Sequence, residues 1–325
     1  MSMQETIKNI APKKVASMEQ AMKSTKTTKT ITKPAMELAT GIKPVKEYDN
    51  YIFDLYGTLI DIHTDEEQPK LWEKMCEYLK TNFGAQYTAK ALRKRYLEVC
   101  ADEEKELQKR NGADFPEIQI EDVWVKLICD KADMVVHDDS VSNYDNASNH
   151  DSNDYSKNLL SPDCPQIHSL CVYFREASRD KLIVYKGVKE TLTILKNQGK
   201  GIYLLSNAQR AFTEKELEDT GLTDYFDDIF ISSDKGIKKP EKAFLQQLLD
   251  ENSLNFDKCV MIGNDIFSDV GVAFKNGMES IFLNTYDFTE KKIDHELSEL
   301  GIKGSELMPV IIGDGDIRAI LPVNK

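Results

Sequence analysis

The amino-acid sequence predicts an α/β fold in which a parallel β-sheet is covered by helices on both faces. From residue 185 onward, short apolar runs alternate with segments of ~10–15 residues whose apolar positions repeat at helical spacing. A similar apolar run, at residues 50–55, lies far upstream of the others. The 325 residues are 41% hydrophobic, which suffices for the core of one large domain or two modest ones.

The first half of the chain is predicted to be mainly helical after a single strand. Residues 50–55 form this strand, which ends at Gly57. From residue 69 to about residue 131 apolar side chains recur at steps of three and four, and no segment alternates like a strand. A further helix is expected from about residue 166 to 181.

A polar segment interrupts the helical block. Fifteen of the 21 residues in the range 138–158 are Asp, Asn or Ser, a composition that cannot bury enough apolar surface to fold. It lacks the central Gly and the closing Glu of a calcium-binding loop. The segment is therefore interpreted as a disordered loop between helices.

The second half predicts helices and strands in alternation. The strands are expected at 202–205, 228–232, 259–262 and 280–283, and the helices after Gly187, at about 211–219, from Pro240 and at about 268–276. Such units imply right-handed crossovers and a sheet covered on both faces. Residues 309–312 form a last apolar run, and residues 313–316 are interpreted as a turn before a short final helix.

Charge and cysteine content exclude several classes of protein. The net charge is −13, but nine Lys against three Glu give residues 1–46 a charge of +6 and leave −19 for the remainder. An acidic body argues against a protein that grips nucleic acid or an anionic membrane. The six Cys form no C-x-x-C pair, and no apolar run approaches the ~20 residues of a membrane span. A cytoplasmic protein without a nucleic-acid or membrane partner is expected, while its oligomeric state is not indicated.

Polar residues follow several of the predicted strands. They are Asp54, Ser206, Lys239, Asp265 and Asp269. Any one of them alone would be explained as a helix cap or a turn residue. Because ligands bind at the carboxyl ends of parallel strands, two acids, a base and a hydroxyl at those ends together predict a functional site.

These residues lie in four segments that resemble the ordered motifs of the haloacid dehalogenase superfamily of hydrolases. The segments are Phe53–Leu59, Leu205–Asn207, Lys239–Phe244 and Gly263–Asp269, and the resemblance covers roughly residues 48 to 285. It implies a Rossmann-like core with a helical cap inserted after the first motif. The domains expected from it are a basic, disordered tail at 1–46, a core at 47–62 and 183–325, and a cap at 63–182 with a disordered insertion near 138–165.

The resemblance also implies roles for individual residues. Asp54 would be a covalent nucleophile, Lys239 a fixed positive charge beside it, and Ser206 a donor to the transferring group. Thr58 and Asn207 would contact substrate, although Asn207 could instead bond backbone. A Mg²⁺ ion would be held by the Asp54 carboxylate, the backbone carbonyl of Tyr56, Asp265 and Asp269, since hard cations prefer oxygen ligands.

Two positions depart from the pattern of most phosphatases in this superfamily. Tyr56 stands where those enzymes carry a second Asp, which protonates the leaving group, and a phenol with an ordinary pKa near ~10 replaces it poorly. Asn264 stands where many relatives carry the metal-binding acid. Asp265, the next residue, is favoured as the ligand because a carboxylate binds Mg²⁺ better than an amide does, but Asn264 could share the metal shell.

The function expected from these features is Mg²⁺-dependent hydrolysis of a small phosphorylated metabolite through an aspartyl-phosphate on Asp54. Tyr56 raises the alternative of a metal-independent 2-haloacid dehalogenase, and a third possibility is a catalytically idle binding protein. Arg175 and Arg179, four residues apart, could hold an anionic substrate, but solvated helix positions are favoured. His63 is interpreted as structural or exposed.

Overall fold

The computed structural model describes residues 45–132, 135–136 and 159–321. The predicted basic tail lies outside these residues apart from its last two, and so does the predicted disordered loop at 138–158. Within the described ranges, no helix is both long enough and apolar enough to cross a membrane.

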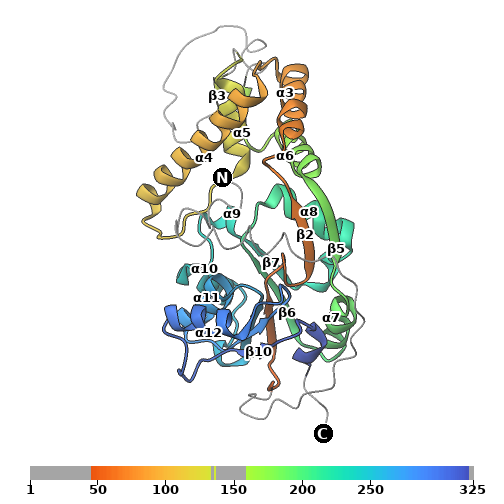
Figure 1. The fold of residues 1–325 in the computed structure, drawn as a ribbon, viewed down its shortest axis with the longest axis vertical. Helices are drawn as coiled ribbons and strands as arrows, with labels where there is room; N and C mark the ends of the chain where they lie inside the picture. Colours follow the sequence, from red (N-terminus) through yellow and green to blue (C-terminus); the bar gives the residue numbers. More distant parts are fainter. Residues whose placement is uncertain (1–44, 133–134, 137–158, 322–325) are drawn as a thin grey trace, which may run out of the picture. The chain divides into compact units, whose positions relative to one another are not determined.

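Six parallel strands form the central sheet, in the order β10-β9-β8-β1-β6-β7 (Figure 1). Their bounds are β1 Asn50–Phe53, β6 Gly201–Ser206, β7 Asp228–Ile231, β8 Cys259–Gly263, β9 Ser280–Leu283 and β10 Val310–Ile312. The predicted α/β class is confirmed. β10 was not predicted as a strand, because three apolar residues before a turn carry little strand signal of their own.

Both faces of the sheet are buried, as the apolar runs predict. In β1, Tyr51 and Phe53 pack on one face with Leu192, whereas Ile52 packs on the other with Phe244. This alternation follows from the two-residue period of a strand. The first face is covered by α7 Val188–Asn197 and α8 Arg210–Thr220, and the second by α10 Lys242–Glu251 and α11 Gly271–Asn276.

Four helices form a separate cluster, here called the helical region (residues 69–178). They are α3 Pro69–Phe83, α4 Ala89–Asn111, α5 Ile120–Cys129 and α6 Pro165–Ser178, with the short strands β3 Val135–Val136 and β4 Leu159–Leu160 beside them. Phe174 of α6 lies with its ring centroid 5.8 Å from that of Trp72 and 5.2 Å from that of Trp124. These aromatic contacts give the helical region an apolar core of its own, which, among the described residues, also includes Ala211 and Phe212 of α8.

An antiparallel ribbon of two strands leads into and out of the helical region. It pairs β2 Ile60–Thr64 with β5 Arg179–Val184 (Figure 1). The predicted helix to residue 181 is therefore wrong in its last turn, because α6 ends at Ser178. Neither ribbon strand was predicted. β5 begins with three charged or polar residues, and its strand conformation depends on pairing with a segment more than a hundred residues away.

The remaining elements are short or lie at the C-terminal edge of the sheet. They are α9 Ser232–Lys235, α12 Glu290–Glu299, the single turns η3 Thr223–Tyr225, η4 Phe256–Lys258 and η6 Ile317–Ile320, and the π-helical turn η5 Ile266–Val270. The helix predicted from residue 268 thus begins earlier, as η5, and continues as α11.

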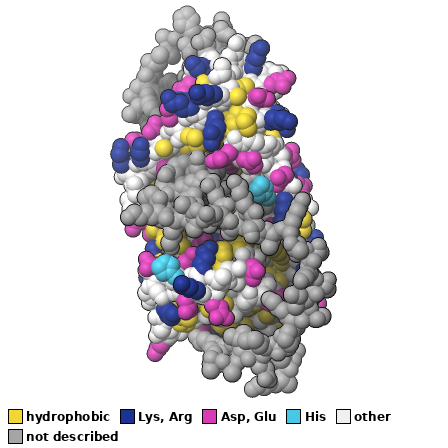
Figure 2. All heavy atoms as spheres, viewed as in Figure 1, with side chains coloured by type: hydrophobic (Ala, Val, Ile, Leu, Met, Phe, Trp, Pro, Cys, Tyr) yellow, Lys and Arg dark blue, Asp and Glu magenta, His cyan; other side chains and the backbone are white. Residues whose placement is uncertain are grey.

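Charged side chains of both signs are interspersed over the face drawn in Figure 2. On that face the described residues present no continuous patch of a single sign.

Candidate active site

Three predicted site residues meet at the carboxyl ends of the central strands. Asp54 directly follows β1, Asp269 lies in η5 after β8, and Lys239 lies in the loop after α9. The Lys239 Nζ donates to Asp54 Oδ1 at 2.7 Å and to the Leu205 carbonyl oxygen at 2.7 Å, and it pairs with Asp269 Oδ1 at 2.7 Å. All three protons of this ammonium are therefore used, in a side chain that is almost completely buried.

The charges in this group do not balance. Burial disfavours the charged form of Lys239, but Asp269 and Asp54 outweigh that effect and hold its pKa above the ordinary value. Burial, together with the charges of Asp54 and Asp265, raises the pKa of Asp269 to about 7 despite the contact with Lys239. One cation thus faces two buried carboxylates. The excess of carboxylate favours the binding of a further cation.

Asn264, at the end of β8, faces the same group. Thr58 Oγ1 lies 3.0 Å from Asp54 Oδ2 and 3.2 Å from Asn264 Oδ1. A hydroxyl has one proton and can donate to only one of these oxygens at a time. Two buried acceptor oxygens therefore converge with too few donors, an arrangement that suits a hard cation.

Asp265 was favoured as the metal ligand, but its surroundings differ from those expected of one. Its side chain is exposed, and its Oδ1 accepts from the Ser268 backbone N–H at 2.6 Å, which caps η5. Its own N–H donates to Asp269 Oδ2 at 3.0 Å. The structure thus places Asn264 beside Thr58 and Asp54, and uses Asp265 to shape the turn that carries Asp269. Among the residues with described side chains, no three His, Cys, Asp or Glu groups are arranged to hold a metal ion.

Ser206 ends β6 and Asn207 follows it, and the two differ in their hydrogen bonding. The Ser206 hydroxyl is fully buried and has no hydrogen-bond partner among the described residues. An unpaired buried hydroxyl costs roughly 1–3 kcal/mol, so it is a group for which a ligand atom would be a favourable partner. Asn207 donates through Nδ2 to the Lys239 carbonyl at 3.0 Å and accepts from the Lys239 N–H at 2.8 Å. The second of the two roles considered for Asn207, bonding to backbone, is the one observed.

Tyr56 points its phenol into a second buried group of charged residues. The hydroxyl donates to Glu216 of α8 and lies 3.1 Å from Thr213 Oγ1. Burial, followed by the charge of Glu216, raises the pKa of Tyr56 well above its ordinary value, so this phenol stays protonated. Its hydrogen bonds hold the loop after β1 against α8.

Arg175 and Arg179 belong to this second group. Arg175 Nε donates to Glu216 Oε1 at 2.7 Å, and Arg179 Nη1 donates to the same oxygen at 2.8 Å. Their side chains are only 12% and 14% exposed, so the prediction of solvated helix positions is wrong. The physical reason is Glu216, which the sequence analysis did not single out: a carboxylate with no exposed surface needs paired cations. His63, by contrast, is exposed as expected and lies 2.7 Å from Asp180.

A residue that the sequence analysis missed, Tyr286, lies beside the loop after β1. Gly57 has a φ of +85°, and a Cβ there would lie 2.2 Å from Asn264 Nδ2 and 2.6 Å from Tyr286 Oη. Thr285 Oγ1 donates to the Gly57 carbonyl at 2.6 Å. The turn after β9 therefore closes over the glycine of the first motif. Nothing in the sequence marks Tyr286, because it lies beyond the last motif.

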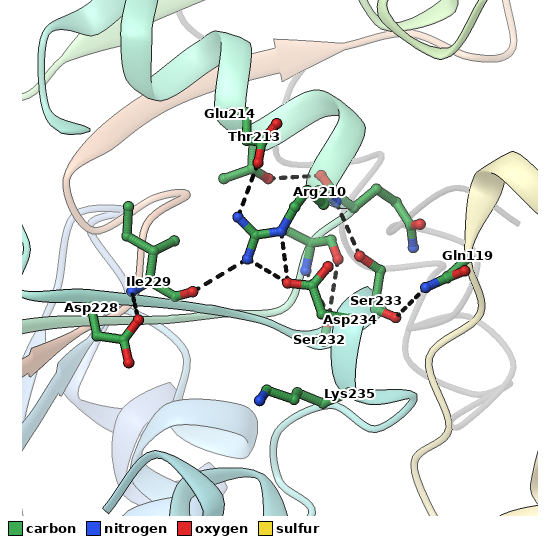
Figure 3. A network of polar contacts seen from close by, with 12 residues as sticks. Gln119, Arg210, Thr213, Glu214, Asp228, Ile229, Ser232, Ser233, Asp234 and Lys235 are labelled. Carbon is green, nitrogen blue, oxygen red and sulfur yellow. Dashed lines mark hydrogen bonds and ion pairs between the residues drawn. The ribbon is translucent and has the colours of Figure 1, made fainter. Parts of the chain in front are cut away.

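The loop that carries Lys239 is held by the helical region and by α8. Its Gly236 carbonyl accepts from the Glu117 N–H at 3.1 Å, and the Lys238 N–H donates to the Phe115 carbonyl at 3.0 Å. Figure 3 shows the preceding turn, where Arg210 binds Asp234 and Gln119 donates to the Ser233 carbonyl. Helical-region residues thus fix the approach of Lys239 to Asp54.

Asp54, Lys239 and Asp269 lie within the part of the chain that matches a known family. The chain matches the family described as haloacid dehalogenase-like hydrolase over residues 48–277. It is 27% identical to the ribulose-1,5-bisphosphate 5-phosphatase of Halopiger xanaduensis. The aligned 133 residues make up 38% of this chain and 56% of that protein. It is 34% identical to the phosphoglycolate phosphatase of Nitrosococcus oceani. The aligned 90 residues make up 28% of this chain and 40% of that protein.

The chain spans about half the length of the curated relatives that it matches. Among solved structures, the 2-haloacid dehalogenase of Pseudomonas syringae pv. Tomato DC3000 is similar with a TM-score of 0.50 at 16% identity, over 83% of this chain and 95% of that one. At this identity the likeness shows the fold alone.

Proposed function

Because the chain belongs to the haloacid dehalogenase-like hydrolase family, we propose that it is a Mg²⁺-dependent phosphatase of a small phosphorylated metabolite. The observation that carries the proposal is the meeting of Lys239 with Asp54 and Asp269. The neighbouring strand β6 ends in a Ser206 hydroxyl that has no hydrogen-bond partner among the described residues. The phosphatases among its relatives support the same reaction class.

Asp54 is the nucleophile in this proposal. One carboxylate oxygen attacks phosphorus, the bond from phosphorus to the leaving oxygen breaks, and water then hydrolyses the aspartyl-phosphate to regenerate the carboxylate. Lys239 binds Asp54 Oδ1 and Thr58 binds Oδ2, so the carboxylate is held in one orientation before substrate arrives. Ser206 would donate to an oxygen of the transferring group.

The oxygen-rich donor set fits a Mg²⁺ ion. Asp54, Asn264 and Asp269, with the Tyr56 backbone carbonyl, would hold it, and Asn264 takes the place first expected for Asp265. A bound Mg²⁺ supplies positive charge that offsets the charge of the phosphoryl group. The excess of buried carboxylate over Lys239 and the two acceptor oxygens around Thr58 support this assignment.

Protonation of the leaving group distinguishes this chain from most relatives. Tyr56 is bound to Glu216 and carries no carboxylic acid that could protonate the departing oxygen. Without that acid, the leaving group departs as an anion or takes its proton from water. We therefore expect the rate to fall steeply as the pKa of the leaving alcohol rises, with phenyl phosphates cleaved faster than alkyl phosphates.

The helical region would act as the cap in the proposed domain organisation, with residues 63–182 as cap and 47–62 and 183–325 as core. Its separate apolar core supports this division. The ribbon of β2 and β5 spans both proposed boundaries.

A 2-haloacid dehalogenase is the second candidate, and Tyr56 is the observation that favours it. The two candidates are separated by assaying a panel of phosphorylated metabolites and short 2-haloacids, each with Mg²⁺ and with a chelator. The phosphatase proposal predicts phosphate release that needs Mg²⁺, and no halide release. Halide release that persists in chelator, without phosphatase activity, would replace it with the second candidate.

A further inference from the structure

The carboxylate of Glu117 lies between two loops that follow neighbouring strands of the sheet. Glu117 belongs to the segment between α4 and α5, in the helical region. Its Oε1 accepts from Gln209 Nε2, in the loop after β6, at 3.0 Å. Its Oε2 lies 3.2 Å from Ser232 Oγ, directly after β7. One acid of the helical region therefore connects the ends of β6 and β7, which are paired in the sheet.

The contact between Gln209 and Glu117 has a defined direction. Gln209 Oε1 accepts from the Ile120 N–H at 2.9 Å, and its Nε2 also donates to the Ile118 carbonyl at 2.9 Å. A backbone N–H can only donate and a backbone carbonyl can only accept, so these two partners fix which end of the amide is which. Nε2 is therefore the donor to Glu117, and Glu117 is the acceptor.

The backbone next to Glu117 is paired with the segment that leads to Lys239. Pro116 and Ile237 form an antiparallel bridge, which the two backbone hydrogen bonds described above flank. Lys238 Nζ lies 3.9 Å from Glu117 Oε2, and these two side chains are 14% and 15% exposed. Glu117 thus contacts the residue immediately before Lys239.

The two loops that Glu117 connects together hold the backbone of Lys239. Asn207, after β6, accepts from the Lys239 N–H at 2.8 Å and donates to its carbonyl at 3.0 Å. The next residue, Ala208, donates through its N–H to Ser232 Oγ at 2.8 Å. A shift of either loop would therefore move the backbone from which the Lys239 ammonium extends.

We propose that Glu117 is a positioning residue which, by joining these two loops, holds the Lys239 ammonium between Asp54 and Asp269. It acts through the loops and not on substrate. The inference deepens the proposed function and rests on it, because Lys239 is part of that site. The helical region thereby sets the geometry of a site whose proposed residues lie outside it.

The test measures how well the Lys239 amine is protected from acetic anhydride, without substrate or Mg²⁺. Acetylation needs a neutral, accessible amine, whereas Lys239 is buried and its pKa is held above the ordinary value by Asp269 and Asp54. Mass spectrometry after brief labelling gives the rate at each lysine. Lys200, whose side chain is 10% exposed and which binds Glu47 at the start of β6, serves as the internal reference.

Two substitutions of Glu117 remove its bridging contacts in different ways. Glu117→Gln keeps the shape but offers one acceptor oxygen and an NH₂ group, so it cannot accept from both loops. Glu117→Asp keeps the charge but is one methylene shorter. Each is expected to raise the acetylation rate of Lys239 several-fold and to leave that of Lys200 unchanged. Glu117→Asp shows whether the effect comes from position or from charge alone.

Glu104→Gln is the matched control. Glu104, on α4, is 34% exposed and lies 3.7 Å from the same Lys238 ammonium, so its loss removes a charge at that place. Acetylation of Lys239 and kcat are both expected to equal those of wild type. On the best phosphorylated substrate, Glu117→Gln is expected to lower kcat by roughly 10–10²-fold, with a smaller change in KM, because Lys239 is misplaced.

The outcomes separate this inference from the proposed function. Faster acetylation confined to Lys239 in both Glu117 variants supports the inference. It is overturned if the Lys239 rate stays at the wild-type value, if Lys200 is accelerated equally, or if Glu117→Gln retains the wild-type kcat. If wild type releases no phosphate from any substrate, the proposed function fails, while acetylation still decides whether Glu117 places Lys239.

Discussion

Two buried clusters of charge meet at the loop after β1, and they differ in whether cations or carboxylates are in excess. The Asp54 cluster (Asp54, Lys239 and Asp269) sets one cation against two carboxylates. The Glu216 cluster (Glu216, Arg175 and Arg179, with the Tyr56 phenol) sets two cations against one carboxylate, and Asp219, 3.9 Å from Arg179, is itself paired with Lys215.

This difference separates structural from functional burial of charge. The Glu216 cluster satisfies its own members, as expected of a group that joins α6 and β5 to α8 and to the loop after β1. The Asp54 cluster has a carboxylate in excess, and the neighbouring strand β6 ends in a Ser206 hydroxyl without a hydrogen-bond partner among the described residues. We infer that the Glu216 cluster stabilises the fold and that the Asp54 cluster is arranged to receive a ligand.

The largest expected effect comes from removing the nucleophile. Asp54→Asn should lower kcat by at least about 10⁴-fold, because an amide oxygen does not form the acyl phosphate. Initial rates on the best phosphorylated substrate measure the loss, and a thermal melt confirms folding. Activity retained by this variant would remove the Asp54 cluster from the chemistry.

The Glu216 cluster should respond in stability. Glu216→Gln leaves two buried guanidinium groups without their shared carboxylate and should lower the free energy of unfolding by about 3–5 kcal/mol. Urea denaturation measures it. Glu214→Gln, on the same helix but 51% exposed and paired with Arg210, is the control, with an expected change of at most about 0.5 kcal/mol. Equal effects of the two substitutions would contradict a special role for the buried carboxylate.

Ser206 should show the opposite balance of effects. Ser206→Ala removes a hydroxyl that has no partner in the described part of the chain, so the free energy of unfolding should stay the same or rise by up to about 1 kcal/mol. Its kcat/KM should fall about 10²-fold, because a donor to the transferring group is lost. A variant that is destabilised yet fully active would show that the hydroxyl serves the fold.

The smallest expected effect is a pH dependence of the Glu216 cluster. Burial opposes ionisation of Glu216, but Arg175 and the hydrogen bonds to Arg175, Tyr56 and Arg179 outweigh burial and hold its pKa below the ordinary value of 4.5. Its stabilising contribution is therefore complete above that value and is lost as the pH falls through the lower folded-state pKa. The stability difference between wild type and Glu216→Gln should be constant from pH 6 to 8 and shrink below about pH 4. A difference that grows on acidification would refute the assignment.

Much of the fold was predictable because its signals are local. The strands β1, β6, β8 and β9 are apolar runs bounded by turn residues, and their ends mark Asp54, Ser206 and Asp269 without any knowledge of packing. The ribbon of β2 and β5 was not predictable, since its strands gain their conformation from each other.

The missed site residues depend on contacts between distant segments. Arg175 and Arg179 look like solvated helix positions until Glu216, some forty residues later, is seen to lie between them. The surroundings of Asp265 and Asn264 follow from the direction of η5, which Asp265 caps. Tyr286 lies in a turn whose position is set by Asn284 and by Thr285 against Gly57, and no motif marks it.

The most direct test of the central claim is to trap the intermediate on Asp54. The enzyme is mixed with Mg²⁺ and its best phosphorylated substrate, quenched in acid within one turnover, and digested for mass spectrometry. We predict one phosphoryl group on the peptide that contains Asp54, removable by hydroxylamine and absent from Asp54→Asn. A phosphoryl group on another residue, or turnover with no phosphorylated peptide at any quench time, would contradict the account.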